Sequence, residues 1–146
     1  MDKIYLWQDS GIKTGTDRPS IVPMLLDTSA APAVLVIPGG GYGILAWNHE
    51  GIDLCSYFNS IGFSAFLLKY RCPDRRAAAH ADAARAIRFV RANADAFNVS
   101  SDRIGILGFS AGGHLASSAM NCFDYGKEGD EIDAVSSRPD FGILCY

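Results

Sequence analysis

The sequence predicts an α/β fold, in which a mainly parallel sheet has helices on both faces. Two observations lead to this prediction: short apolar runs alternate with longer segments of helical spacing, and the runs are continuous rather than interrupted by polar residues. Continuous apolar runs are typical of strands that are buried on both faces. The strand–helix–strand order then implies right-handed crossovers between parallel neighbours. With 146 residues, the chain is long enough for one domain with a hydrophobic core.

Six segments are predicted as strands: residues 4–7, 21–26, 33–37, 64–70, 103–108 and 141–146. The first two are short and are separated by Gly11, Gly15 and Pro19, so we expect an antiparallel pair at the start of the sheet. Pro23 lacks a backbone N–H, which favours an edge position for the second strand.

Three segments are predicted as helices: residues 49–61, 77–97 and 111–120. Gly62 is well placed to end the first of them. The second has one apolar face, and its opposite face carries Arg85, Arg88 and Arg91, which we interpret as a face exposed to solvent. Residues 124–140 are polar and show little periodicity.

Composition and charge disfavour several kinds of partner. The net charge of −3 gives no general attraction to nucleic acid or to an anionic membrane. The N-terminus lacks a basic segment followed by an apolar one, and no apolar run approaches the length of a membrane span. We therefore expect a cytoplasmic protein, although a signal peptide already removed would leave no trace. The 4 cysteines lack CxxC spacing, which argues against a metal site or a disulfide framework, and we expect buried thiols.

The most informative motif is Gly-Phe-Ser-Ala-Gly at residues 108–112. It ends a predicted strand and opens a helix rich in small residues, which is the context of a strained serine nucleophile. Glycines on either side of Ser110 let neighbouring backbone approach, so that its Oγ projects and the helix N-terminus supplies positive potential. The alternative interpretation is an ordinary glycine-rich turn before a helix.

Ester cleavage by a serine also needs a base, a group that orients the base, and N–H donors for the oxyanion. The backbone N–H of Ala111, directly after Ser110, is one candidate donor. The glycines of residues 39–41 supply others, because a chain without side chains can face the substrate carbonyl. Nucleotide binding is the alternative for this loop, but the loop matches neither the dinucleotide-binding fingerprint nor the P-loop pattern and contains no lysine.

With both segments in hand, the chain resembles the α/β-hydrolase superfamily, and within it the hormone-sensitive-lipase-like and the acetylxylan- and feruloyl-esterase-like carboxylesterases. Residues 38–42, Pro-Gly-Gly-Gly-Tyr, are similar to the HGGG-type oxyanion loop of this group, with Pro38 where the lipase branch has His. Further segments fall where the group has similar ones, namely residues 49–51, 68–71, 82–91 and 108–116.

The resemblance implies an α/β-hydrolase fold and assigns roles position by position. It makes Ser110 the catalytic nucleophile and Gly40, Gly41 and Ala111 the oxyanion-hole residues, with no metal and no organic cofactor. In this group the acid and the base lie on loops after two further strands. Residues 1–146 are therefore expected to be the N-terminal part of a single α/β-hydrolase domain, truncated after the strand that follows the nucleophile helix.

No histidine of this sequence is favoured as the base. His114 lies one helical turn beyond Ser110, but the resemblance marks it as part of the helix scaffold. His49 follows the glycine loop, and His80 lies near a helix start. Three explanations for the missing base stay open: a longer polypeptide, a second chain, and a degenerate relative that no longer catalyses.

Two ion pairs are expected around the site. Asp82 lies within helical reach of Arg85, so these two residues are predicted to pair. Glu50 is predicted to pair with Arg71 beneath the glycine loop. The resemblance makes Asp82 and Arg71 scaffold residues.

The function expected from these features is that of a serine carboxylesterase for short-chain acyl esters. The resemblance makes an acetylated or feruloylated carbohydrate the first substrate to consider. Two alternatives stay open: a non-catalytic pseudo-hydrolase or ligand-binding fragment, and a peptidase of the prolyl-oligopeptidase type, whose nucleophile turn has a similar form. The expected partners are a small-molecule or carbohydrate ester, and either a second copy of the chain or a C-terminal remainder of the same protein.

Overall fold

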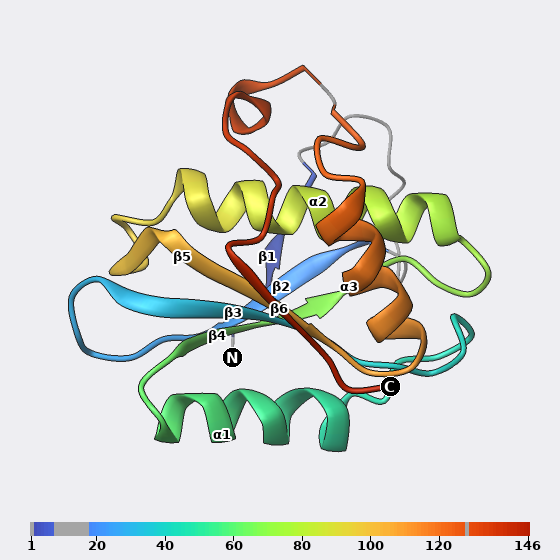
Figure 1. Ribbon diagram of the computed structural model, residues 1–146, viewed down its shortest axis with the longest axis horizontal. Helices are drawn as coiled ribbons and strands as arrows, with labels where there is room; N and C mark the ends of the chain where they lie inside the picture. Colours follow the sequence, from blue (N-terminus) through green and yellow to red (C-terminus); the bar gives the residue numbers. More distant parts are fainter. Residues whose placement is uncertain (1, 8–17, 128) are drawn as a thin grey trace.

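The computed structural model describes residues 2–7, 18–127 and 129–146, which form three layers with a six-stranded sheet in the middle (Figure 1). The strands are β1 (Ile4–Tyr5), β2 (Ser20–Met24), β3 (Ala31–Ile37), β4 (Ser64–Lys69), β5 (Val99–Gly108) and β6 (Phe141–Leu144). They lie in the order β1-β2-β4-β3-β5-β6. Because β4, β3, β5 and β6 are mutually parallel, the predicted mainly parallel sheet is confirmed.

The first two strands pair antiparallel as expected, but β2 is not an edge strand. β4 pairs with β2 along its length, whereas β1 pairs only with Ser20 and Ile21. Pro23 is tolerated because β1, as far as the described residues go, does not extend beside it and no donor is needed there. Gly11 and Gly15 lie outside the described residues.

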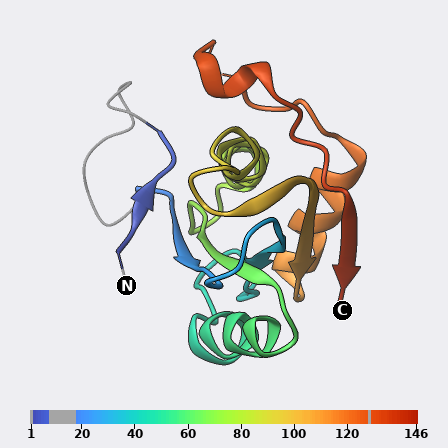
Figure 2. The ribbon, with the colours of Figure 1, turned by 90° about the vertical axis from the view of Figure 1, so that its left-hand side faces the viewer.

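The helical segments are η1 (Asn48–Ile52), α1 (Asp53–Ser60), α2 (Arg76–Ala92), α3 (Ala111–Asn121) and η2 (Glu131–Ala134). α1 covers one face of the sheet, and α2 and α3 cover the other, as predicted (Figure 2). The first predicted helix begins as the π-helical turn η1 and continues as α1. Gly62 follows its end with φ +94°, a conformation that suits a residue without a side chain.

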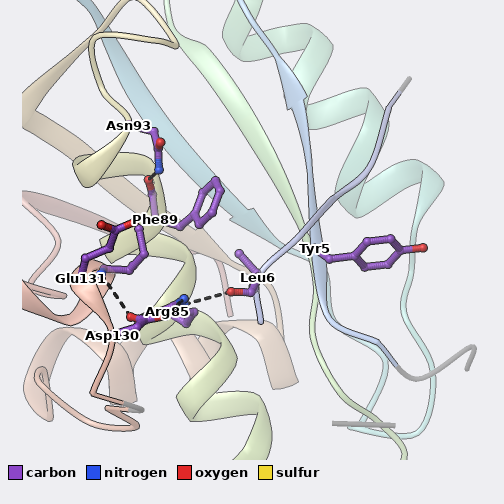
Figure 3. A pocket seen from close by; sticks show the side chains of 8 residues that line it. Tyr5, Leu6, Arg85, Phe89, Asn93, Asp130 and Glu131 are labelled. Atoms are coloured by element: carbon purple, nitrogen blue, oxygen red, sulfur yellow. Dashed lines mark hydrogen bonds and ion pairs between the residues drawn. The ribbon is translucent and has the colours of Figure 1, made fainter. Parts of the chain in front are cut away.

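The arginine face of α2 is not exposed, so that prediction was wrong. Arg85 and Arg88 are 1% and 0% exposed. The segment that contains η2 folds over α2 and brings Asp130 and Asp133 to these guanidinium groups. Arg85 also donates to the carbonyl of Leu6, beside a cavity of about 510 Å³ (Figure 3). The periodicity of one helix cannot show that a segment distant in the sequence packs on its polar face and buries it.

The cysteines are only partly buried. Cys55 is buried, and this burial raises the pKa of its thiol to about 12. Cys72 is half-buried, whereas Cys122 and Cys145 are exposed, so the prediction of buried thiols was wrong for these two. Cys122 lies where α3 ends, and Cys145 lies just after the outer strand β6.

Neither a metal-binding cluster nor a membrane-spanning helix is present among the described residues. They contain no group of three or more His, Cys, Asp and Glu side chains that could hold a metal ion. They also contain no helix that is both long enough and apolar enough to cross a membrane.

Candidate active site

Ser110 occupies the sharp turn between the end of β5 and the start of α3. Its backbone has φ 52° and ψ −117°, and its side chain is exposed. A residue with a side chain adopts such a positive φ at a cost of about 1–3 kcal/mol, which the surrounding packing must supply. The turn has the strand-to-helix context that the motif predicts.

Gly108 and Gly112 permit this turn because backbone atoms fill the space that a side chain would need. A Cβ at Gly112 would lie 2.2 Å from the carbonyl oxygen of Ile37. A Cβ at Gly108 would lie 2.1 Å from the carbonyl oxygen of Gly112. The end of β3 and the start of α3 therefore pack backbone against backbone, and this contact holds Ser110 at the rim of the sheet.

The glycine loop lies directly against the Ser110 turn. A Cβ at Gly39 would lie 3.2 Å from the Cβ of Ser110 and 2.6 Å from the carbonyl oxygen of Phe109. Gly40 and Gly41 have φ values of 137° and 62°, a region that favours glycine. The fold thus brings the two predicted segments, far apart in the sequence, into contact.

Hydrogen bonds fix the direction of the peptide groups in this loop. The carbonyls of Gly39 and Gly40 accept hydrogen bonds of 2.9 to 3.1 Å from backbone N–H groups within residues 43–46. In a trans peptide the N–H points opposite to the C=O, so the N–H groups of Gly40 and Gly41 point away from that turn. Within the described part of the chain, neither these two N–H groups nor that of Ala111 has a protein acceptor.

The three histidines lie in three different environments. His114 Nδ1 lies 2.7 Å from the hydroxyl oxygen of Tyr42, and the two rings meet edge to face. His80 stacks on Tyr125 with ring centroids 4.4 Å apart, and burial lowers the pKa of its imidazole. His49 is exposed on η1. Among residues 2–7, 18–127 and 129–146, no histidine is hydrogen-bonded to the serine hydroxyl of the strained turn.

The predicted pair between Asp82 and Arg85 is absent, so this prediction was wrong. Asp82 is fully buried and accepts hydrogen bonds of 2.7 to 3.1 Å from the Arg71 side chain. It also accepts one of 2.8 Å from the indole N–H of Trp7. Arg85 instead contacts Asp130 of the segment that covers α2. Helical spacing brings two side chains near each other, but it does not prevent either of them from pairing with a residue from elsewhere in the chain.

The predicted pair between Glu50 and Arg71 was also wrong. Glu50 Oε2 accepts the backbone N–H of Gly39 at 2.8 Å, and its Oε1 accepts the hydroxyl of Tyr146 at 2.6 Å. The carbonyl of Tyr146 in turn accepts the backbone N–H of Ser110 at 2.8 Å. Sequence reasoning missed these contacts because no local spacing rule relates the residues that make them.

A sheet of this order, with a strained serine turn after β5 and a glycine loop after β3, is the arrangement of the α/β-hydrolase fold. The BD-FAE family model matches residues 22–134. The chain belongs to the BD-FAE family. The expected fold and the resemblance to the carboxylesterases of this superfamily are confirmed.

Similar proteins include enzymes whose names refer to xylan. The chain is 34% identical over 130 residues to an acetylxylan esterase of Xylanibacter ruminicola. The alignment covers 88% of this chain and 25% of that protein. The chain is 39% identical over 120 residues to endo-1,4-beta-xylanase B of Butyrivibrio fibrisolvens, covering 77% of this chain and 19% of that protein. Among solved structures, an acetyl ester-xyloside bifunctional hydrolase from Caldicellulosiruptor lactoaceticus is 41% identical to this chain and has a TM-score of 0.86. The match covers 97% of this chain and 55% of the chain of that hydrolase. The chain thus spans a quarter or less of these two relatives and about half of this solved structure.

Proposed function

We propose that this chain carries the nucleophile and the oxyanion hole of a serine carboxylesterase. The observation that supports this most strongly is the exposed Ser110 at a strained turn, packed against a glycine loop. Its Oγ would attack the ester carbonyl carbon, and the carbonyl oxygen would become an oxyanion. The N–H groups of Gly40, Gly41 and Ala111 would then donate to that oxyanion, each contributing about 3 kcal/mol in the transition state.

The reaction needs two proton transfers that Ser110 cannot perform alone. A base must take the hydroxyl proton during attack and give it to the departing alcohol as the C–O bond breaks. The same base then activates the water that hydrolyses the acyl-enzyme. We infer that this base and its orienting acid come from outside residues 1–146. Two observations support the inference. Among the described residues, no histidine is hydrogen-bonded to the Ser110 hydroxyl. The chain also matches only about half of the length of the similar solved structure.

A carbohydrate ester with a short acyl group is the proposed substrate, with acetyl tested first and feruloyl second. Two of the similar proteins are named for acetyl ester or acetylxylan hydrolysis. A surface pocket of about 380 Å³ adds support, because it is lined by Leu45 and Trp47 from the turn that follows the glycine loop, together with Lys3 and Lys69. An indole ring offers a flat apolar face on which a sugar ring can stack.

The 146-residue chain by itself is expected to hydrolyse p-nitrophenyl acetate at least about 10²-fold more slowly than the polypeptide encoded by the full reading frame, because a positioned base contributes about that much. Both proteins are assayed at equal concentration, after circular dichroism has shown that each is folded.

Equal turnover by the two proteins would show that the base lies within residues 1–146. If the His114→Ala substitution then abolished that turnover, the base would be His114. The proposal that the base lies outside this chain would be withdrawn.

A further inference from the structure

The carboxylate of Glu50 contacts both the glycine loop and Tyr146, the residue whose carbonyl accepts the N–H of Ser110. One oxygen accepts the backbone N–H of Gly39 at 2.8 Å, and the other accepts the hydroxyl of Tyr146 at 2.6 Å. Glycine permits this approach, since a Cβ at position 39 would lie 2.8 Å from Glu50 Oε2 and 2.6 Å from the backbone carbonyl oxygen of Phe109. We propose that Glu50 is a positioning residue that holds the glycine loop in the orientation needed for oxyanion binding. This inference rests on the proposed function of Ser110.

The contact with Glu50 completes a set of anchors on the loop. The carbonyls of Gly39 and Gly40 are held by backbone N–H groups within residues 43–46. These bonds orient the peptides that carry the N–H groups of Gly40 and Gly41. At the entry to the loop, the buried hydroxyl of Tyr70 donates to the carbonyl of Pro38 at 2.9 Å. The Glu50 carboxylate also holds that entry by accepting the Gly39 N–H, and it is the charged one of these two side-chain anchors.

The same carboxylate couples the loop to the nucleophile turn. Tyr146 donates its hydroxyl to Glu50, and its carbonyl accepts the N–H of Ser110 at 2.8 Å. The hydrogen bond to Glu50 raises the pKa of the Tyr146 phenol above its ordinary value, at which a phenol is already protonated and able to donate at neutral pH. Because the phenol is largely exposed, whereas the Gly39 amide is enclosed by the turn, we assign the larger effect to the contact with Gly39.

Loss of this anchor should affect the transition state more than substrate binding. A hydrogen bond to a charged acceptor is about twice as strong as a neutral one. Without Glu50, the peptide between Pro38 and Gly39 would keep only the neutral hydrogen bond from Tyr70 and would be held less firmly. The oxyanion forms after substrate binding, and misdirected donors therefore lower kcat rather than raise KM. Removing one oxyanion donor typically costs about 10²–10³-fold in kcat, and a misdirected loop should cost about 10- to 100-fold.

The test uses the polypeptide encoded by the full reading frame and compares four variants, Glu50→Ala, Glu50→Gln, Glu50→Asp and Tyr146→Phe. For Glu50→Ala we expect kcat on p-nitrophenyl acetate to fall about 10- to 100-fold and KM to stay within about 3-fold. Glu50→Gln keeps an acceptor at the same reach and should recover at least about 5-fold of the lost kcat. Glu50→Asp keeps the charge but falls about 1.5 Å short, so its kcat should stay near that of Glu50→Ala. Tyr146→Phe removes one contact of Glu50 and leaves its contact with Gly39 in place, so its kcat should fall less than that of Glu50→Ala.

Two results would overturn the proposal: a Glu50→Ala protein with wild-type kcat, or a Glu50→Asp protein with kcat equal to or above that of Glu50→Gln. The second comparison decides the question even if Glu50→Ala fails to fold. Ser110→Ala is assayed in parallel. If Ser110→Ala is inactive and Glu50→Ala is fully active, this inference fails alone; if Ser110→Ala is active, the proposed function fails.

Discussion

Replacing Ser110 by Ala is expected to lower kcat for p-nitrophenyl acetate by at least about 10³-fold in the polypeptide encoded by the full reading frame. The Oγ of Ser110 is the atom proposed to form the acyl bond, and its loss leaves only the oxyanion donors and substrate binding to accelerate hydrolysis. The substitution removes an exposed oxygen and leaves the turn around it unchanged, so the protein should remain folded. Steady-state kinetics and a thermal melt measure the two effects separately.

Ser118→Ala is the matched control for this substitution. Ser118 lies on the same helix, two turns further on, and its hydroxyl donates to the carbonyl of His114 at 3.0 Å. Its loss should leave kcat within about 3-fold of the wild type, since surface changes of this kind are usually small. A Ser110→Ala protein that kept more than about a tenth of the wild-type kcat would remove Ser110 from the mechanism.

The Asp82→Ala substitution is expected to lower the free energy of unfolding by about 3–5 kcal/mol, because breaking a buried ion pair leaves its partner charge uncompensated. Asp82 lies on α2 and is fully buried against the segment after β4. Its loss would leave the Arg71 guanidinium and the Trp7 indole N–H without this acceptor. Urea denaturation followed by circular dichroism gives the difference from the shift of the midpoint.

Asp102→Ala serves as the control because Asp102 is exposed and its carboxylate accepts a hydrogen bond from the nearby Ser100 hydroxyl. We expect a change within about 0.5 kcal/mol for this variant. If Asp82→Ala cost less than about 1 kcal/mol, water would have to replace the lost carboxylate, and the cluster of Asp82, Arg71 and Trp7 would not be a main source of stability.

The parts of the fold that could be predicted from sequence are those fixed by neighbouring residues. The strand at residues 33–37 is a continuous apolar run, and a strand buried on both faces needs nothing else to be recognised. The Ser110 turn was also predictable, because the glycines at positions 108 and 112 indicate that backbone packs closely around it. In both cases the physical cause lies within a few residues of the effect.

The parts that could not be predicted depend on contacts between distant segments. Arg85 resembled an exposed helix residue, and only the position of Asp130 in space shows that it is covered. Glu50 resembled a partner for Arg71, yet the loop entry at Gly39 offers an N–H at closer reach. Charged side chains pair with whatever the fold brings near them, and periodicity carries no information about that choice.

The central claim, that the Ser110 hydroxyl is the nucleophile, is tested most directly by covalent labelling and mass spectrometry. The polypeptide encoded by the full reading frame is incubated with a fluorophosphonate, digested, and its peptides are sequenced. We expect one phosphonyl group per molecule, located on Ser110, with hydrolysis of p-nitrophenyl acetate lost in proportion to labelling. A protein that hydrolyses the ester while Ser110 stays unmodified, or that is labelled at another residue as activity disappears, would contradict this account.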